Sequence, residues 1–303
     1  MMPAVSIGLP VYNGERYLKV AIESILGQTF GDLELIISDN ASTDATQDIC
    51  EQFTRLDSRV SCIRHPHNVG VTLNFNGVVG HARAPLFKWA SADDLIEPDL
   101  LERCVDVLAH DASVVLVHSR TRFIDADGLE TPREDSPLHL MENLPSERLQ
   151  GLWERLRYCN AQYGVMRIEA LRTMPLFGSF IGSDLCFLAE LCLHGKFYEI
   201  DAPLLLRRIH GRAASSLAPE ELVEHYGLRH DRFVAYYWRH LGEHLAMLMR
   251  ASIGGRERMR ALVLLARRTW WQRSELSDET RFLFRYLLGR PYPILGAVRR
   301  RDG

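Results

Sequence analysis

The sequence lacks the features of a secreted or membrane-spanning protein. Residues 1–10 hold no basic stretch followed by a longer apolar segment, which is the pattern of a secretion signal. No stretch approaches the roughly 18 apolar residues that a helix needs to cross a bilayer. We therefore expect a soluble, cytoplasmic protein whose only contact with a membrane is peripheral, at its inner face.

Close cysteine pairs are also missing. The six cysteines are scattered through apolar stretches, with no CxxC spacing that would indicate a zinc site or a redox pair. We expect them to be buried thiols in a reducing compartment. There is no internal repeat and no low-complexity segment, so the chain belongs to the ordinary globular class.

Charge is distributed unevenly along the chain. The formal net charge is -3, but residues 219–303 carry 16 Arg against 10 Asp and Glu, which makes that segment +6 and the remainder -9. In the basic segment, aromatic and leucine residues are interleaved with arginine. This composition suits a helix on a membrane surface, and aromatic residues at helical spacing also pack on a core or a second subunit. Both readings stay open, and we expect no nucleic-acid partner.

Short apolar runs alternate with segments of helical periodicity through the first 120 residues. Turn residues and helix caps such as Asn13, Gly14 and the segment Asp39–Asp44 separate them. Such alternation predicts an α/β fold with a mostly parallel, Rossmann-like sheet flanked by helices. The predicted strands are Ala4–Leu9, Leu33–Ser38, Val60–Arg64, Leu86–Ala90 and Val114–His118. The predicted helices are a stretch that includes Leu18–Leu26, then Ala45–Phe53, Thr72–His81 and a helix that Pro98 opens.

The second half of the chain has a different organisation. Residues Thr131–Glu147 are rich in proline and charge and are predicted to form a surface loop or lid. Two more strands and a helix between Asp184 and Gly195 complete the first domain, and after Pro219 the pattern is almost wholly helical. We expect a domain over residues 1–215, divided into halves near residue 120, followed by a helical region over 216–303. The predicted strands here are Tyr163–Arg167 and Leu204–Ile209, and the predicted C-terminal helices are Glu221–Arg250, Arg256–Arg273 and Ser277–Leu288.

The adjacent carboxylates Asp93 and Asp94 directly follow a predicted strand. Such a pair can hold a hard divalent cation that also binds phosphate oxygens, although a bare Asp-Asp pair also occurs in solvated turns and helix caps. Other polar residues follow the neighbouring predicted strands, and parallel strands place their carboxyl ends at one edge of the sheet. This arrangement favours a nucleotide-binding site over a solvated turn. Tyr12 could stack on a base there, and Asp39 could accept hydrogen bonds from a base or ribose.

Four segments in this order resemble the family 2 glycosyltransferases of GT-A fold, over about residues 4–212. They are Val5–Asn13 (VSIGLPVYN), Leu35–Asp44 (LIISDNASTD), His67–Gly70 (HNVG) and Trp89–Asp94 (WASADD). The resemblance implies that Pro10, Tyr12 and Asp39 line the base and that Asp93 and Asp94 bind ribose and the metal-diphosphate. It also implies Mg²⁺ or Mn²⁺ as the cofactor and a nucleoside-diphosphate sugar as the donor. Residues 1–215 would then be the catalytic domain, with a nucleotide half to about 120 and an acceptor half from 121.

Further residues are assigned through the same resemblance. Asp184 matches the family's catalytic base, and this fits the need to remove a proton from the acceptor hydroxyl; as a plain alternative it caps its helix. His210 is a candidate metal ligand, and Arg208 is a candidate phosphate contact. The remaining donor-binding candidates are Asn13, Asn68, Asn74 and Gly164, of which Asn74 stands near the place where members often carry an arginine and Gly164 lies on a strand that borders the sugar.

The resemblance implies an inverting, metal-dependent glycosyltransferase of hexosyl or N-acetylhexosaminyl type, with a UDP-sugar favoured as the donor. The acceptor would be the hydroxyl of a glycan, a lipid-linked molecule or another compound, in polysaccharide or glycoconjugate synthesis. Two alternatives remain: a non-catalytic protein that binds a nucleotide or glycan, and a sugar nucleotidyltransferase. The latter would show a glycine-rich basic loop after the first strand, where this chain has Pro10–Gly14 (PVYNG).

Overall fold

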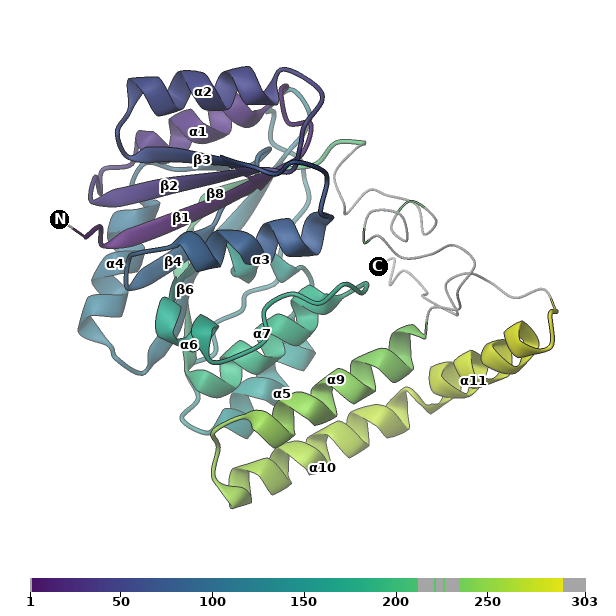
Figure 1. Ribbon diagram of the computed structural model, residues 1–303. Coiled ribbons are helices and arrows are strands. Elements are labelled where there is room, and N and C mark those ends of the chain that lie inside the picture. Colours follow the sequence, from purple (N-terminus) through teal and green to yellow (C-terminus); the bar gives the residue numbers. More distant parts are fainter. Residues whose placement is uncertain (1, 212–220, 222–225, 227–234, 291–303) are drawn as a thin grey trace.

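The computed structural model describes residues 2–211, 221, 226 and 235–290. One eight-stranded sheet runs through the molecule in the order β3-β2-β1-β4-β7-β6-β8-β5, with helices packed on both of its faces (Figure 1). The predicted α/β architecture is therefore confirmed. The boundary predicted near residue 215, and the first part of the helix predicted over Glu221–Arg250, lie outside the described residues.

The first half follows the predicted alternation. Strands β1 and β2 are buried at all seven of their positions, as expected for parallel strands covered on both faces. Helix α1 buries Leu18, Ala21, Ile22 and Ile25, which share one face at helical spacing. The elements are β1 (Val5–Val11), α1 (Leu18–Leu26), β2 (Leu33–Asp39), α2 (Thr46–Leu56), β3 (Val60–Arg64), α3 (Val71–His81), β4 (Leu86–Trp89), β5 (Leu95–Ile96), α4 (Leu100–His110) and β6 (Val114–Ile124).

The second half contains elements that the sequence patterns did not indicate. The predicted loop Thr131–Glu147 gives way at Pro145 to a helix, α5, with proline in its first turn. Strand β8 begins eight residues earlier than predicted and runs for 13 residues. The elements are α5 (Pro145–Arg155), a 3₁₀ turn (Cys159–Tyr163), β7 (Val165–Arg167), α6 (Ile168–Arg172), α7 (Ser183–His194) and β8 (Lys196–Arg208).

The sheet is mixed in its second half. Strands β3, β2, β1 and β4 run parallel, and β6 and β8 are also parallel. The short strand β7 pairs antiparallel with both β4 and β6, and β5 pairs antiparallel with β8. This last pairing aligns Leu95 with Leu206, so the residues after β4 are brought against the end of β8, 111 residues further along the chain.

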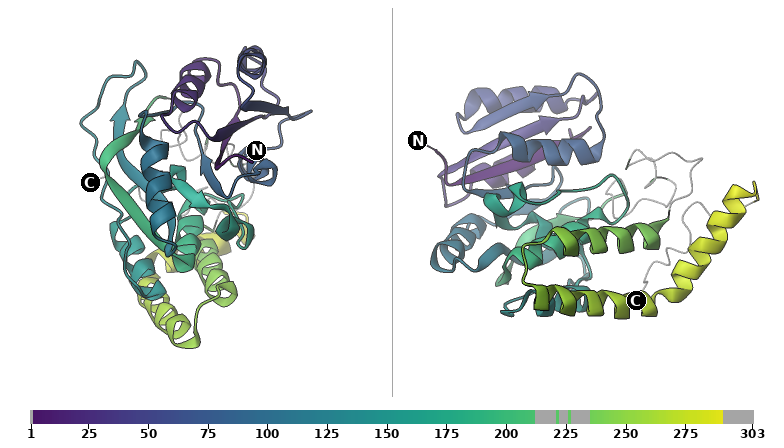
Figure 2. Two further views of the ribbon diagram at one scale, coloured as in Figure 1. Left: turned by 90° about the vertical axis from the view of Figure 1, so that its left-hand side faces the viewer. Right: turned by 60° about the horizontal axis from the view of Figure 1, so that its bottom comes forward.

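Three helices follow at the C-terminal end: α9 (Tyr236–Arg250), α10 (Gly255–Trp271) and α11 (Arg273–Leu287). Helix α9 packs against α7, and α10 packs against α5 and α9, while α11 extends away from the sheet (Figures 1 and 2). Of the predicted helical C-terminal region, these three helices cover most of residues 236–287. Within the described residues, no helix combines the length and apolar character required to cross a bilayer.

Candidate functional site

The carboxyl ends of the parallel strands meet at one edge of the sheet, as predicted. Val11 at the end of β1 is in register with Asp39 at the end of β2, which in turn is in register with Arg64 at the end of β3. Two residues near this edge, Asn13 and Ala41, have φ angles of 51° and 59°. Non-glycine residues rarely adopt positive φ, and such conformations cluster at functional sites.

Asp39 is completely buried at this edge. Its Oδ1 accepts a hydrogen bond from the backbone N–H of Ser42 at 2.9 Å, and its Oδ2 forms an ion pair with Arg64. The Arg64 guanidinium also donates to the Ser42 carbonyl oxygen at 2.9 Å. A buried carboxylate needs such partners. Arg64 was not singled out in the sequence, although its place at the end of a predicted strand was a usable signal.

The other candidate residues of the nucleotide half lie at different depths below the surface at this edge. Tyr12 is 49% exposed and available for stacking. Asn13 Oδ1 accepts from the Thr43 N–H at 2.8 Å, so it ties the two loops together. Asn68 Oδ1 accepts from Asn40 Nδ2 at 2.9 Å. Asn74 is buried below them, where its Oδ1 accepts from Ser38 Oγ at 2.6 Å and its Nδ2 donates to the Ser38 carbonyl at 3.1 Å. Its amide is thus bonded within the fold.

The acidic pair is held by the end of β8. The backbone N–H of Arg208 donates to Asp94 Oδ1 at 2.8 Å, and Arg208 Nε donates to the Asp93 carbonyl at 3.0 Å. His210 Nε2 lies 2.8 Å from Asp93 Oδ2. The antiparallel pairing of β5 with β8 produces these contacts. Asp93, Asp94, Arg208 and His210, which the sequence analysis proposed separately, therefore form one cluster.

Arg208 links this cluster to the loop after β6 and to Tyr17. It is buried, its Nη1 donates to the carbonyl of Asp125 at 3.0 Å, and its guanidinium carbon lies 4.5 Å from the ring centroid of Tyr17. The Tyr17 ring also lies 5.2 Å from His210, centroid to centroid. Arg208 thus fixes the positions of the acidic pair and of the neighbouring loop, and its positive charge stands beside them.

The two carboxyl groups have different proton affinities. Burial raises the pKa of Asp94 to about 7, and the neighbouring Asp93 charge adds to the effect. Burial also acts on Asp93, but hydrogen bonds from His210 and Ser91 outweigh it and hold its pKa below the ordinary value. Two carboxylates and an imidazole form a donor set that suits Mn²⁺ or Mg²⁺. A divalent cation would offset the repulsion between the carboxylates, so these residues fit the implied metal.

Asp184 stands in the first turn of α7, where its Oδ1 accepts from the Leu185 N–H at 2.9 Å. Tyr163 connects it to the acidic pair. Burial raises the pKa of the Tyr163 phenol, and the charges of Asp94, Asp93 and Asp184 all raise it further. Tyr163 and Asp94 also line one small cavity. The three acidic groups therefore all lie near the Tyr163 phenol, and Asp184 does not lie on a remote face.

Two further cationic residues lie in this region: Lys88, which the sequence analysis missed, and Arg207, which together with Arg208 was a candidate for the diphosphate contact that Asn74 leaves in doubt. Lys88 is buried beneath the acidic pair, donates to the carbonyl oxygen of Tyr163, and has its pKa lowered to about 8 by burial. Arg207 donates to Asn160 Oδ1, and its charge lowers the pKa of Asp94. A lysine inside the otherwise apolar run 86–90 was a usable signal for Lys88.

The glycine at position 164 has a packing role. A Cβ at Gly164 would come within 2.4 Å of the Val117 carbonyl oxygen and 2.7 Å of Leu116 Cδ1. The neighbouring strand β6 therefore explains why no side chain is present at this position. Approach of a donor sugar is not needed to account for it.

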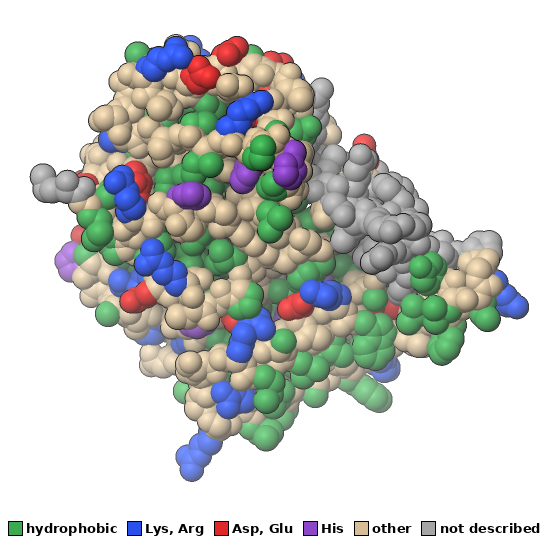
Figure 3. Space-filling view, in the orientation of Figure 1, with side chains coloured by type: hydrophobic (Ala, Val, Ile, Leu, Met, Phe, Trp, Pro, Cys, Tyr) green, Lys and Arg blue, Asp and Glu red, His purple; other side chains and the backbone are tan. Residues whose placement is uncertain are grey.

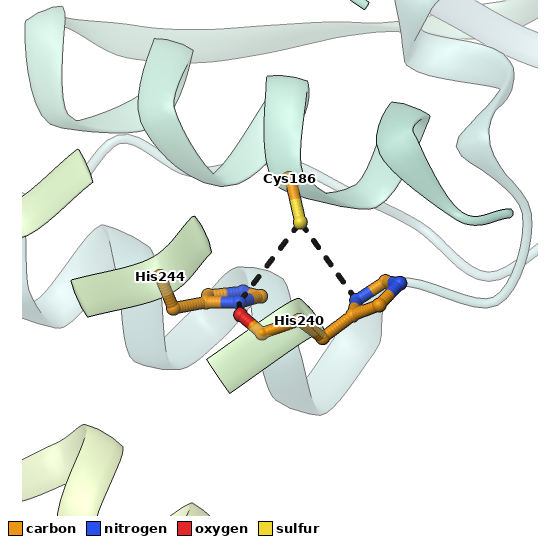
Figure 4. Close-up of side chains that lie close together, drawn as sticks. All are labelled: Cys186, His240 and His244. Atoms are coloured by element: carbon orange, nitrogen blue, oxygen red, sulfur yellow. Dashed lines mark hydrogen bonds between the residues drawn. The ribbon is translucent and has the colours of Figure 1, made fainter. Parts of the chain in front are cut away.

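A cluster next to Asp184 was not foreseen from the sequence. Cys186 on α7 and His240 and His244 on α9 have their potential ligand atoms within 4.8 Å of one another (Figure 4). The four-residue spacing of the two histidines on one helix was the available signal. Because its members come from two helices that are far apart in the sequence, this cluster forms without a CxxC pair of cysteines.

The hydrogen bonds of this cluster assign its protons. Trp153 Nε1 can only donate, so His244 Nε2 accepts at 3.3 Å and His244 Nδ1–H donates to the His240 carbonyl at 2.6 Å. His240 Nε2–H donates to the Ile181 carbonyl at 2.9 Å, and its Nδ1 accepts from Cys186 at 3.7 Å. A metal bound to His244 Nδ1 would displace the proton that this nitrogen donates to the His240 carbonyl. These donor and acceptor roles therefore favour a structural hydrogen-bond network over a metal site.

This network places α9 against the loop that leads to Asp184. Gly182, in the left-handed region at φ 80°, is so close to His240 that a Cβ would come within 2.8 Å of the imidazole ring. The hydrogen bond from His240 to Ile181 fastens the same loop. Helix α9 thus helps to determine where the Asp184 helix begins.

Acid should destabilise the fold through this cluster. Burial lowers the pKa of His244 to about 3 and also lowers that of His240. Below about pH 6.5 these histidines bind protons in the unfolded chain but remain neutral in the folded protein. The free energy of unfolding therefore falls as the pH falls from about 6.5 towards 3. For His244 alone the expected loss is about 2 kcal/mol at pH 5, at about 1.4 kcal/mol per pH unit.

Urea unfolding at pH 7.5 and pH 5 measures this loss. The variant His244→Asn should show a smaller difference between the two pH values, whatever its stability at pH 7.5. The control His81→Gln replaces an exposed histidine and should keep the wild-type difference. An unchanged difference in His244→Asn would show that His244 is protonated in the folded protein.

Comparison with known proteins agrees with this geometry. The family model described as glycosyl transferase family 2 matches residues 6–174, which is more than half of the chain. EpsH of Bacillus subtilis is 30% identical over 219 residues, covering 69% of this chain and 61% of EpsH. Chondroitin synthase of Escherichia coli is 35% identical over 146 residues, covering 48% of this chain and 21% of that protein. The chain thus spans less than two thirds of these relatives.

Solved structures show the same fold at low sequence identity. Residues 1–349 of Staphylococcus aureus TarS, in complex with UDP, superpose with a TM-score of 0.63 at 15% identity, covering 88% of this chain and 71% of that chain. The mannosyltransferase PcManGT from Pyrobaculum calidifontis, in complex with GDP-Man and Mn²⁺, gives 0.54 at 16% identity, covering 96% and 89%. The GT-A fold expected from the sequence is confirmed, and the chain belongs to glycosyl transferase family 2.

Proposed function

We propose that this protein transfers a sugar from a nucleoside-diphosphate sugar to an acceptor hydroxyl with inversion of the anomeric centre. The observation that carries the proposal is the joining of Asp93 and Asp94 to Arg208 and His210 at the sheet edge, within one region with Asp184. Family membership supports the reaction class. The donor set supports metal dependence.

The nucleotide half holds the donor. Tyr12 stacks on the base, and the edge formed by Pro10, Asn13 and Asp39 borders the base and ribose. Asp39 is already paired with Arg64, so its buried carboxylate orders the pocket and leaves exposed neighbours for direct contact. TarS structures in complex with UDP and with UDP-GlcNAc favour UDP over GDP in our proposal, and an N-acetylhexosamine or hexose as the sugar.

Asp93, Asp94 and His210 would hold Mg²⁺ or Mn²⁺, and when bound the ion neutralises the charge that develops on the leaving diphosphate. Asp184 takes the proton from the acceptor hydroxyl as its oxygen attacks the anomeric carbon from the face opposite the diphosphate. The C1–O bond to the diphosphate breaks while the new glycosidic bond forms. A single displacement of this kind inverts the configuration. Lys88 and Arg207 keep positive charge beside the acidic pair.

The first test uses purified protein and a panel of UDP-, GDP- and dTDP-sugars with a mixture of glycan and lipid-linked acceptors. We expect release of the nucleoside diphosphate with UDP-sugars in the presence of Mn²⁺ or Mg²⁺, and loss of more than about 90% of it with excess EDTA, because catalysis here depends on the ion. Restoring the ion should restore activity.

The outcomes separate the alternatives. Release of pyrophosphate from a sugar phosphate and a nucleoside triphosphate would identify a nucleotidyltransferase. A rise in melting temperature with UDP and Mn²⁺, without turnover on any acceptor, would identify a binding protein. Equal activity with and without EDTA would contradict metal dependence.

A further inference from the structure

Among the described residues, the C-terminal helices carry most of the large hydrophobic side chains that are exposed. Eleven of the 17 large hydrophobic side chains that are exposed in the described residues lie between positions 238 and 288. In Figure 3 the hydrophobic side chains gather along the edge formed by α9, α10 and α11. Contiguous apolar surface of this kind marks an interaction site. We call it the C-terminal face and define it by Trp238, Leu245, Met249, Met259, Val263, Trp270, Trp271, Leu283, Phe284, Leu287 and Leu288.

The face is organised along the helices and is not a scatter of single residues. On α10, Met259, Val263 and Trp270 follow one another at intervals of four and seven, so they share one side of the helix. The end of α11 presents Phe284 and Leu287, which are 61% and 66% exposed. Between α9, α10 and α11 lies an open groove of about 650 Å³ with mainly apolar walls.

Arginine surrounds this apolar surface. Residues 236–290 contain 11 Arg, no Lys and five acidic residues, a net charge of +6, in a chain whose total is -3. Two of these guanidinium groups lie over exposed indoles: Arg273 is 4.7 Å from the Trp270 ring centroid, and Arg267 is 4.6 Å from that of Trp271. Cation–π contacts of this type hold positive charge next to the apolar side chains.

Charge decides between the two occupants that this face could take. A second copy of the chain would bring one +6 surface against another, and like charges in an interface oppose association. A bilayer with anionic headgroups offers the opposite charge together with an apolar interior. Tryptophan beside arginine suits the boundary between headgroups and acyl chains, where one part of each side chain is apolar and the other is wet.

We propose that the C-terminal face docks on the surface of an anionic membrane, with α10 and α11 lying against the headgroups. The apolar residues of the two helices enter the acyl boundary, and the arginines that flank them bind lipid phosphates. This property goes beyond the proposed transfer reaction and does not depend on it, because the face contains none of the candidate catalytic residues.

The test is sedimentation of the whole protein with vesicles. Wild-type protein should pellet with vesicles of equal parts phosphatidylglycerol and phosphatidylcholine, and bind phosphatidylcholine vesicles at least about tenfold more weakly, since anionic lipid supplies the electrostatic attraction. Raising NaCl from about 0.1 M to about 0.5 M should weaken binding, because salt screens exposed charges. Tryptophan emission should shift to the blue and be quenched by brominated acyl chains.

Matched variants locate the contact. The triple change Trp270→Ser, Phe284→Ser and Leu287→Ser removes exposed apolar groups and should weaken vesicle binding by about tenfold or more, because affinity scales with buried apolar area. The control Val20→Ser, Leu56→Ser and Leu73→Ser removes apolar groups that are also exposed, on α1, α2 and α3, and should leave binding unchanged. Melting temperatures establish that both variants are folded.

Three results would overturn the proposal. One is wild-type protein that stays in the supernatant with anionic vesicles at low salt, a result that requires no variant. The second is equal vesicle binding by wild type and the folded triple variant. The third is a dimer in light scattering that the triple variant dissociates and that anionic vesicles do not, which would assign the face to a second copy of the chain.

Discussion

Replacing Asp184 by asparagine should lower the turnover number by about 10²- to 10⁴-fold, which is the usual contribution of a positioned general base. The amide cannot take the acceptor proton, but it has nearly the same shape, and its oxygen can still accept the Leu185 N–H bond that Asp184 accepts at the start of α7. Donor affinity should therefore stay within about twofold of wild type. Steady-state kinetics with the preferred donor, and calorimetry with UDP and Mn²⁺, measure the two quantities.

Asp48→Asn is the matched control. Asp48 is the acidic residue in the first turn of α2, as Asp184 is in the first turn of α7. Both substitutions remove the same favourable interaction with a helix dipole, so both should have similar small effects on stability. Only Asp184→Asn should affect turnover. Wild-type turnover in that variant would reduce Asp184 to a helix-capping residue.

Asp94→Asn should lower metal-dependent turnover by about 10²- to 10³-fold, the magnitude found when one electrostatic contact to a developing charge is removed. The substitution keeps an oxygen for the hydrogen bond from the Arg208 backbone, 2.8 Å away, so the β5–β8 junction should persist. It removes the negative charge that we propose binds the cation. The Mn²⁺ affinity, measured by electron paramagnetic resonance, should fall by about tenfold or more.

Asp127→Asn provides the comparison for Asp94. Asp127 is an exposed carboxylate on the loop whose preceding residues accept hydrogen bonds from Arg208, so its replacement changes the net charge near the site without touching the acidic pair. It should bind Mn²⁺ and turn over as wild type does. Unaltered Mn²⁺ affinity in Asp94→Asn, with wild-type turnover, would mean that the carboxylates at 93 and 94 only brace the end of β8.

Local patterns were sufficient for most of the first half of the fold. The strand Val60–Arg64 and the helix from Leu18 appear where apolar periodicity predicts them, because their burial is decided by spacing along a short segment. The antiparallel strand β7 was not predicted in its direction, since an apolar run is equally buried whichever way it points. The first three residues of helix α5 were assigned to a loop and the rest of the helix was not predicted, because the proline-rich segment before it conceals the helix start at Pro145.

In the candidate site, too, local patterns indicated some residues and missed others. Asp39, Asp93, Asp94 and Asp184 were proposed from their positions after strands or at a helix start. The structure has Asp39 at the carboxyl edge of the parallel strands and Asp93, Asp94 and Asp184 near the Tyr163 phenol. The partners that hold them came to light only in three dimensions. Arg64 pairs with Asp39, and Lys88 lies beneath the acidic pair. Arg64 and Asp39 are 25 residues apart in the chain, whereas Lys88 precedes the acidic pair by only five and six residues and comes near it because the chain turns after β4.

By itself the sequence determined the alternating architecture, the edge of the sheet that carries the acidic residues and the family, because hydrophobic spacing and short motifs are properties of neighbouring residues. Only the tertiary structure decided that β8 returns to bring Arg208 and His210 onto Asp93 and Asp94, and that Asn74 is bonded inside the fold. It also decided that Cys186 meets two histidines of α9 and that the basic helices leave an apolar face open. These outcomes depend on packing between segments about 50 to 120 residues apart, and their energies come from burial and electrostatics that no local pattern encodes.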